Sequence, residues 1–216
     1  ATNNSVVATV SVGDKPAAIC WSPTSNKVYV ACAPYTGNGS IHVINAATNS
    51  VVTSVDVGAT PVAVAWCSAQ NKVYCLNPGS NSVSVVRCSD DQLLTTISIP
   101  DQAPVDLTYN PANDQVYFTS AAISQSGKVR AVDCSTDEIV ASVTAGLNTS
   151  YLAINPVSNR VYANNKTANT VTVVNGSDNQ RLGNVQVRQE PTPLLWTPQN
   201  KLFVGEYWGN SVAFMH

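Results

Sequence analysis

Short runs of alternating apolar and polar residues follow one another along the chain, each bounded by Gly, Pro, Asn or Ser. In the first part of the chain they cover residues 17–22, 27–32, 40–44 and 49–57, and the alternation is clearest in "NKVYVA" and "SIHVI". A period of two is typical of β-strands. No stretch has a helical period long enough to predict a helix, so we expect an all-β protein.

This pattern of runs is itself repeated. The stretch "VATVSVGDKPAAICWSPTSNKVYVAC", which begins at Val7, returns at Val52 as "VTSVDVGATPVAVAWCSAQNKVYCLN". The position of Pro23 recurs at intervals of 42 to 45 residues, as Ser68, Pro111, Pro156 and Pro198. Four strands repeated at such a period are typical of the blades of a β-propeller. The sequence predicts a five-bladed β-propeller with four-stranded antiparallel blades; a β-sandwich, the alternative, would not require the repeat.

The repeat also predicts how the chain is organised. We expect one domain, residues 1–216, with units at about 2–47, 48–89, 90–135, 136–177 and 178–216. Residues 5–12 resemble the outer fourth strand of a unit, whereas the last unit ends after its third strand, at 211–215. We therefore expect the N-terminal strand to complete the last blade and close the ring, which would protect the edge of "NSVAFMH".

A related tetrapeptide lies in the second strand of each unit: Tyr29-Val30-Ala31-Cys32, Tyr74-Cys75-Leu76-Asn77, Tyr117-Phe118-Thr119-Ser120, Tyr162-Ala163-Asn164-Asn165 and Phe203-Val204-Gly205-Glu206. With the surrounding "VxVGxxPxxxxxSPxxNKVYVxN", it resembles the YVTN-type β-propeller repeat over essentially the whole chain. The resemblance implies an exported, surface-layer-like propeller. Members of this group often carry seven units, so a chain of five departs from the usual ring size; a fragment is the alternative to the closed five-bladed ring expected here.

Composition narrows the classes of partner. Charged residues make up 11% of the chain and the net charge is -2, so no basic surface is available for nucleic acid. The longest apolar runs are strand-sized, too short to span a membrane as a helix. Six cysteines and five Asn-x-Ser/Thr acceptors favour an extracytoplasmic, secreted or cell-surface protein. The acceptors are Asn3, Asn38, Asn148, Asn165 and Asn175.

Residues for metal or nucleophilic chemistry are sparse. The two histidines, His42 and His216, have no spacing typical of a metal site, and no GxSxG motif is present. We therefore predict no cofactor and no metal site. The cysteines lack CxxC spacing, which leaves disulfides or buried thiols, and we expect at least one disulfide. The six are Cys20, Cys32, Cys67, Cys75, Cys88 and Cys134.

A binding site is expected on the face that surrounds the central channel, where two sets of loops meet. The inner loops lead into the first strand of each unit, at 13–16, 58–61, 101–104, 146–149 and 188–191. The middle loops join the second and third strands, at 33–39, 78–81, 121–127, 166–169 and 207–210. Two middle loops, "APYTGNG" and "AAISQSG", are longer, which indicates either a specialised face or neutral drift.

Asp106 is the polar residue that stands out, because its repeat equivalents are Ala18, Ala63, Tyr151 and Pro193. Its carboxylate is either a site acid or ligand anchor near the channel, or a structural group satisfied by loop N–H groups and water. In the first case it would act with Lys15, Asn148 or Glu190, which share one inner-loop position.

Aromatic residues form two groups. One repeat position holds Trp21, Trp66, Tyr109, Ile154 and Trp196, and this recurrence predicts packing between blades. Tyr35, Tyr207 and Trp208 lie in middle loops without aromatic counterparts, where they could bind a sugar or a protein.

The best-supported function from sequence is an exported, non-catalytic binding or scaffold module, with a protein or carbohydrate partner at the cell surface. A lectin-like carbohydrate binder is the nearest alternative, although the loops differ between units. A small lyase or hydrolase would need paired carboxylates at the channel mouth, for which Asp106, Glu190 and Asp101 are the candidates. The sequence predicts neither the ligand nor the oligomeric state.

Overall fold

A computed structural model describes residues 4–100, 103–121 and 125–215. Its strands form five antiparallel sheets, here called blades 1 to 5, each a simple meander. Blade 1 contains β1 (Pro16–Ser22), β2 (Lys27–Cys32), β3 (Ser40–Asn45) and β4 (Ser50–Asp56). Blade 2 contains β5 (Ala63–Cys67), β6 (Lys72–Asn77), β7 (Ser82–Arg87) and β8 (Gln92–Ser98), with the 3₁₀ helix η1 (Pro78–Ser80).

Blades 3 to 5 follow the same order. Blade 3 contains β9 (Pro104–Asn110), β10 (Gln115–Ser120), β11 (Ser126–Asp133) and β12 (Glu138–Leu147). Blade 4 contains β13 (Thr149–Asn155), β14 (Arg160–Asn165), β15 (Thr170–Asn175) and β16 (Gln180–Gln186). Blade 5 contains β17 (Pro191–Thr197), β18 (Lys201–Glu206) and β19 (Ser211–Met215). The all-β prediction is confirmed, and within the described ranges no helix is long and apolar enough to cross a membrane.

The turns between first and second strands explain why Asn and Asp recur in the sequence. Each turn places one such residue at a positive φ, a conformation that Asn and Asp adopt more readily than other non-glycine residues. These residues are Asn26, Asn71, Asp114, Asn159 and Asn200, with φ between 49° and 57°. The repeat in the sequence therefore reflects both the alternation within the strands and the Asn or Asp that each turn requires.

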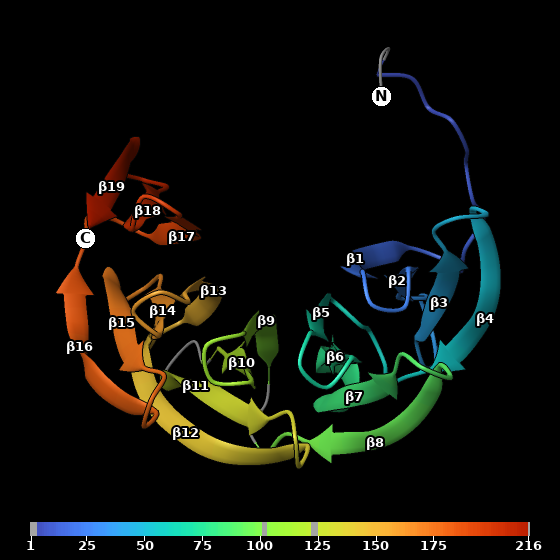
Figure 1. Cartoon of the computed structure of the whole chain (residues 1–216). Helices are drawn as coiled ribbons and strands as arrows, with labels where there is room; N and C mark the ends of the chain where they lie inside the picture. Colours follow the sequence, from blue (N-terminus) through green and yellow to red (C-terminus); the bar gives the residue numbers. More distant parts are fainter. Residues whose placement is uncertain (1–3, 101–102, 122–124, 216) are drawn as a thin grey trace.

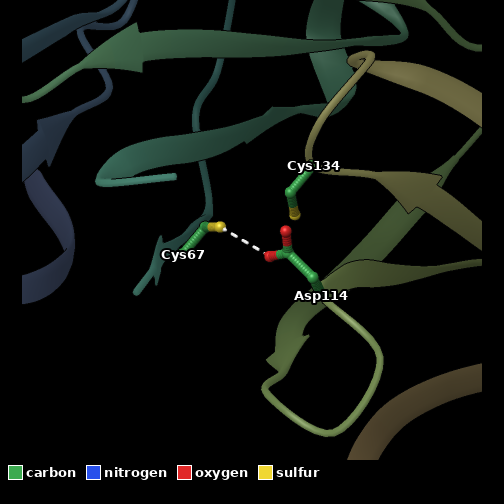
Figure 2. Close-up of side chains that lie close together, drawn as sticks. All are labelled: Cys67, Asp114 and Cys134. Atoms are coloured by element: carbon green, nitrogen blue, oxygen red, sulfur yellow. Dashed lines mark hydrogen bonds between the residues drawn. The ribbon is translucent and has the colours of Figure 1, made fainter. Parts of the chain in front are cut away.

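Polar contacts join neighbouring blades at two kinds of point: one recurs at the first three junctions and the other at all four. The signature tyrosine donates a hydrogen bond to an acidic or amide residue one blade further on, as Tyr29 does to Asp91 (3.0 Å) and Tyr74 to Asp137 (2.5 Å). The second point joins the last residue of an inner strand to the positive-φ turn residue of the next blade. Figure 2 shows its form between blades 2 and 3, where the Cys67 Sγ–H donates to Asp114 Oδ1 at 3.2 Å.

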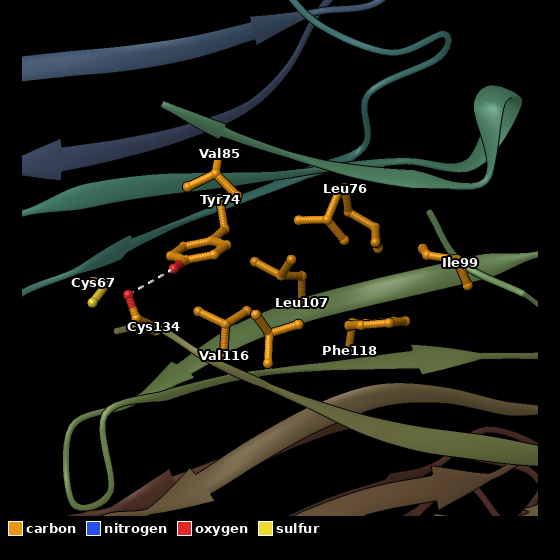
Figure 3. Packing of buried hydrophobic residues seen from close by; sticks show 11 residues of the cluster. Cys67, Tyr74, Leu76, Val85, Ile99, Leu107, Val116, Phe118 and Cys134 are labelled. Carbon is orange, nitrogen blue, oxygen red and sulfur yellow. Dashed lines mark hydrogen bonds between the residues drawn. The ribbon is translucent and has the colours of Figure 1, made fainter. Parts of the chain in front are cut away.

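Apolar side chains fill the space between neighbouring blades, in four clusters. Figure 3 shows the cluster between blades 2 and 3, where Leu76 and Val85 face Leu107, Val116 and Phe118. The predicted aromatic position packs in these clusters. Its members there are Trp66, Tyr109, Ile154 and Trp196.

The two end blades leave their outer faces uncovered. Trp21, at the same repeat position in blade 1, is 56% exposed, and its neighbour Ile19 is 67% exposed, because no described sheet packs on that side. In blade 5, Leu195, Val212 and Phe214 are each 62% exposed on the face that would meet a following blade. The repeated packing therefore stops at both ends with apolar side chains in solvent.

The predicted closure of the ring is not confirmed. Figure 1 shows the five sheets along an open arc, with β1 at one end and β17–β19 at the other, and an N-terminal segment that leads away from the sheets. Residues 4–12 form no strand, and blade 5 has three strands instead of four. The four apolar clusters each pack one blade against the next along the chain, and none of them joins blade 1 to blade 5 among the described residues.

Candidate functional site

The inner and middle loops lie on one face, as expected, and a backbone hydrogen bond ties them together in each blade. The first residue of a middle loop, or the second in blade 2, donates its N–H to the carbonyl oxygen of an inner loop. The pairs are Ala33 to Lys15, Gly79 to Ala59, Ala121 to Ala103, Lys166 to Asn148 and Tyr207 to Glu190. The predicted residues Lys15, Asn148 and Glu190 also share a positive φ of 50°, 55° and 50°, so the backbone fixes where each side chain leaves the loop.

The Asp106 carboxylate accepts hydrogen bonds from the backbone of two neighbouring blades. Its Oδ1 accepts the Leu107 N–H at 2.9 Å and its Oδ2 accepts the Leu152 N–H at 2.8 Å, which joins the inner strands of blades 3 and 4. Burial raises the pKa of this carboxyl group, and the two backbone hydrogen bonds oppose the rise. Because both oxygens are engaged, the carboxylate serves the junction between blades.

Lys15 and Tyr35 meet each other at blade 1. The Lys15 ammonium lies over the Tyr35 ring, a cation–π contact in which the tyrosine remains 88% exposed. Figure 1 shows blade 1 and blade 5 at opposite ends of the arc, so this pair is separate from Glu190, Tyr207 and Trp208.

Glu190 and Trp208 come together in a surface pocket between blades 4 and 5. The pocket has a volume of about 340 Å³, and its other lining residues are Lys166, Thr167, Asn169 and Gln189. The Asn169 Oδ1 accepts the Glu190 N–H at 2.8 Å, which links the inner loop of blade 5 to the middle loop of blade 4. Trp208 is 66% exposed and stands edge-on to Tyr207, with ring centroids 4.9 Å apart.

The pocket thus combines one carboxylate, one ammonium, one hydroxyl, two amides and an indole ring. Two of the predicted residues, Glu190 and Trp208, line the pocket. Two others lie next to lining residues: the Asn148 carbonyl oxygen accepts the Lys166 N–H, and the Tyr207 ring packs against Trp208. Lys166, Thr167, Asn169 and Gln189 were not singled out from sequence, although loop 166–169 was assigned to this face. Asp101 lies outside the described residues.

All six cysteines are free thiols in the structure, so the expected disulfide stays a prediction. Cys20, Cys75 and Cys88 lie in or against the apolar cluster between blades 1 and 2. Burial raises the pKa of Cys20 to about 12 and that of Cys88 to about 11, so both remain protonated at neutral pH. Two other thiols, Cys67 and Cys134, lie close to the Asp114 carboxylate between blades 2 and 3.

Comparisons with known proteins bear on the fold. No family model matches the chain, and no curated protein is similar to it in sequence. The resemblance to the YVTN-type repeat therefore stays a prediction.

One similar solved structure is hydrazine synthase from Kuenenia stuttgartiensis, with a TM-score of 0.72 and 19% sequence identity. The match covers 89% of this chain and 57% of that chain, so this protein spans less than two thirds of the neighbour's length. At this identity the likeness indicates a propeller-like arrangement of the sheets. Altogether 1504 chains of known structure match, and a fold this widespread does not select a function.

Proposed function

We propose that the protein is an exported, non-catalytic binding module whose ligand binds in the pocket between blades 4 and 5. The observation that carries this proposal is the meeting of Trp208 with Glu190, Asn169 and Lys166 in one surface hollow. Ligand sites typically combine an apolar surface with a few fixed polar groups. Here the backbone bonds to Glu190 fix the polar groups, and the indole ring supplies the apolar surface.

A carbohydrate is the ligand class that best fits these side chains. A sugar ring has an apolar face that can stack on an indole, and its hydroxyl groups can bond to carboxylate and amide oxygens. The other blades do not reproduce this set of residues, which favours a single site over one site per blade. The repeat's resemblance to surface-layer-like propellers and the extracytoplasmic composition support a role at the cell surface.

The pocket supports the alternative function, a lyase or hydrolase, less well than it supports ligand binding. Glycoside hydrolysis commonly uses two carboxyl groups on either side of the scissile bond. Glu190 is the one carboxylate among the described residues that line the pocket, and both Asp106 oxygens bind backbone N–H groups.

A glycan array followed by titration calorimetry would test the proposal. We expect Trp208→Ala and Glu190→Gln each to weaken binding at least tenfold, about 1.4 kcal/mol. Trp21→Ala is the matched control, since Trp21 is a similarly exposed tryptophan on blade 1, and it should leave the affinity within about threefold. Equal losses from Trp208 and Trp21, or no glycan bound by the parent protein, would contradict a carbohydrate site in this pocket.

A further inference from the structure

A polar pair recurs at the junctions between blades, on the face opposite the pocket. The last residue of an inner strand bonds to the turn residue at positive φ in the next blade. Ser22 donates to Asn71 (3.0 Å), Asn110 to Asn159 (2.7 Å) and Asn155 to Asn200 (2.7 Å). These pairs of hydroxyl and amide groups hold neighbouring blades in register.

The junction between blades 2 and 3 differs in chemistry. Cys67 replaces the hydroxyl or amide, Asp114 replaces the asparagine, and Cys134 lies at the turn after β11. The two sulfur atoms and a carboxylate oxygen all lie within 4.8 Å of one another. Figure 2 shows the three side chains converging, with the carboxylate directed toward both sulfurs. Among the described residues this is the one group of three such donors.

We propose that Cys67, Asp114 and Cys134 bind a thiolate-preferring divalent cation, of which Zn²⁺ is the best fit. A zinc ion takes sulfur at about 2.3 Å and oxygen at about 2.0–2.2 Å, so two tetrahedral thiolates lie roughly 3.8 Å apart. The donor spacing here is within about 1 Å of that arrangement. Three protein ligands leave a fourth position for water or a small ligand.

Neighbouring groups already orient these ligands. The Asp114 Oδ1 accepts the Tyr109 hydroxyl at 3.1 Å, and its Oδ2 accepts the Gln70 amide at 2.8 Å. The Lys72 ammonium donates to the Cys134 carbonyl oxygen at 2.8 Å, which fixes the turn that carries this cysteine. Such supporting hydrogen bonds around ligands commonly change metal affinity by about 10- to 100-fold.

The burial and the charge of these three side chains also suit the binding of a cation. Both thiols are fully buried, whereas Asp114 is half-buried, so the carboxylate side of the site is open to an arriving ion. Each thiol would release its proton to solvent as the ion binds, because thiolate is the ligand form. Two thiolates and one carboxylate around a divalent cation leave one negative charge. The nearby Lys72 ammonium is paired with the Asp137 carboxylate at 2.8 Å, so this charge faces the half-buried, solvent side of the site.

Binding of Co²⁺ to the reduced full-length chain would test the site, because cobalt bound to thiolates shows a charge-transfer band and visible d–d bands. We expect one metal ion per chain, and at least a tenfold loss of affinity in Cys67→Ser, Cys134→Ser and Asp114→Asn. Cys67→Ser recreates the Ser22 junction and should fold, which circular dichroism would check. Cys88→Ser, in the neighbouring junction, is the matched control and should bind as the parent does.

Two results would overturn the proposal. One is the absence of a thiolate–cobalt band in the reduced parent protein, or a band that Cys88→Ser removes and Cys67→Ser does not. The other is a Cys67–Cys134 disulfide, found by mass spectrometry after alkylation without reductant in protein from its native source. The pair would then be a covalent cross-link. Because this site and the pocket are on opposite faces, neither outcome depends on glycan binding.

Discussion

At the scale of single residues, one side chain often satisfies several needs at once. Asn71 adopts a φ of 49° to make its turn, accepts hydrogen bonds from Ser22 and Trp66, and donates one to Ser25. Glu206, at the end of β18, is buried and accepts the Arg188 N–H at 2.7 Å and the Ser211 hydroxyl at 2.6 Å. The same residue thus ends a strand and fixes the loops on either side.

Glu206 gives a pH-dependent prediction. The Ser211 hydroxyl and the Arg188 N–H stabilise the carboxylate and hold the pKa of Glu206 below its usual 4.5. A lowered pKa contributes stability above pH 4.5 that is lost as the pH falls through the lowered value. We expect Glu206→Gln to lower the free energy of unfolding by about 1–2 kcal/mol at about pH 7, and by less at about pH 3, where the contribution of the lowered pKa has begun to be lost.

Urea unfolding at the two pH values would measure this difference. Glu138→Gln, which changes an exposed carboxylate at the start of β12, is the control and should have little effect at either pH. If Glu206→Gln lowers the free energy of unfolding equally at both pH values, the packing of the side chain, and not its negative charge, accounts for the stabilisation.

At the scale of elements, the strands follow from local signals. The runs at 27–32 and 40–44 became β2 (Lys27–Cys32) and β3 (Ser40–Asn45), because alternation and turn residues act over a few positions. The metal-type cluster could not be predicted in this way. Cys67 and Asp114 are 47 residues apart and meet only because blade 3 packs on blade 2. The pocket was predicted in part. The repeat indicates which loops share the face, but it does not indicate which of their side chains meet in one pocket.

One repeat position offers a direct comparison between elements. Trp66 packs against the cluster between blades 1 and 2 and donates its indole N–H to Asn71, whereas Trp21 is 56% exposed. We expect Trp66→Ala to lower the free energy of unfolding by about 2–3 kcal/mol and Trp21→Ala by less than about 0.5 kcal/mol. Denaturant unfolding checks both. Similar losses would indicate that something covers Trp21 in solution.

At the scale of the whole molecule, the sheets form a series in which each blade contacts its neighbours. Stability in such arrays is approximately the sum of repeat and interface terms, and end units open first. Closure of the ring could not be read from the sequence, because strand alternation says nothing about the rotation between blades. The N-terminal run 5–12 has strand-like alternation, yet these residues form no strand in the structure.

A truncation tests this arrangement. If the arc is open in solution, deletion of residues 1–12 should change the free energy of unfolding by less than about 1 kcal/mol, because little apolar surface is lost. If the segment instead completes blade 5, the loss should be several kcal/mol, the scale of a strand's buried face and hydrogen bonds. Thermal melting and hydrogen exchange of β19 in both proteins would distinguish the two.

The uncovered ends of the arc are unlike surfaces: blade 1 presents Ile19 and Trp21, and blade 5 presents Leu195, Val212 and Phe214. Copies joined end to end would therefore meet heterologously, without a twofold axis. Each added copy would leave one exposed end of each kind, so further copies could always add. The assembly would stop growing only if the rotation from copy to copy closed it into a ring. Otherwise the product would be a filament whose length follows the protein concentration.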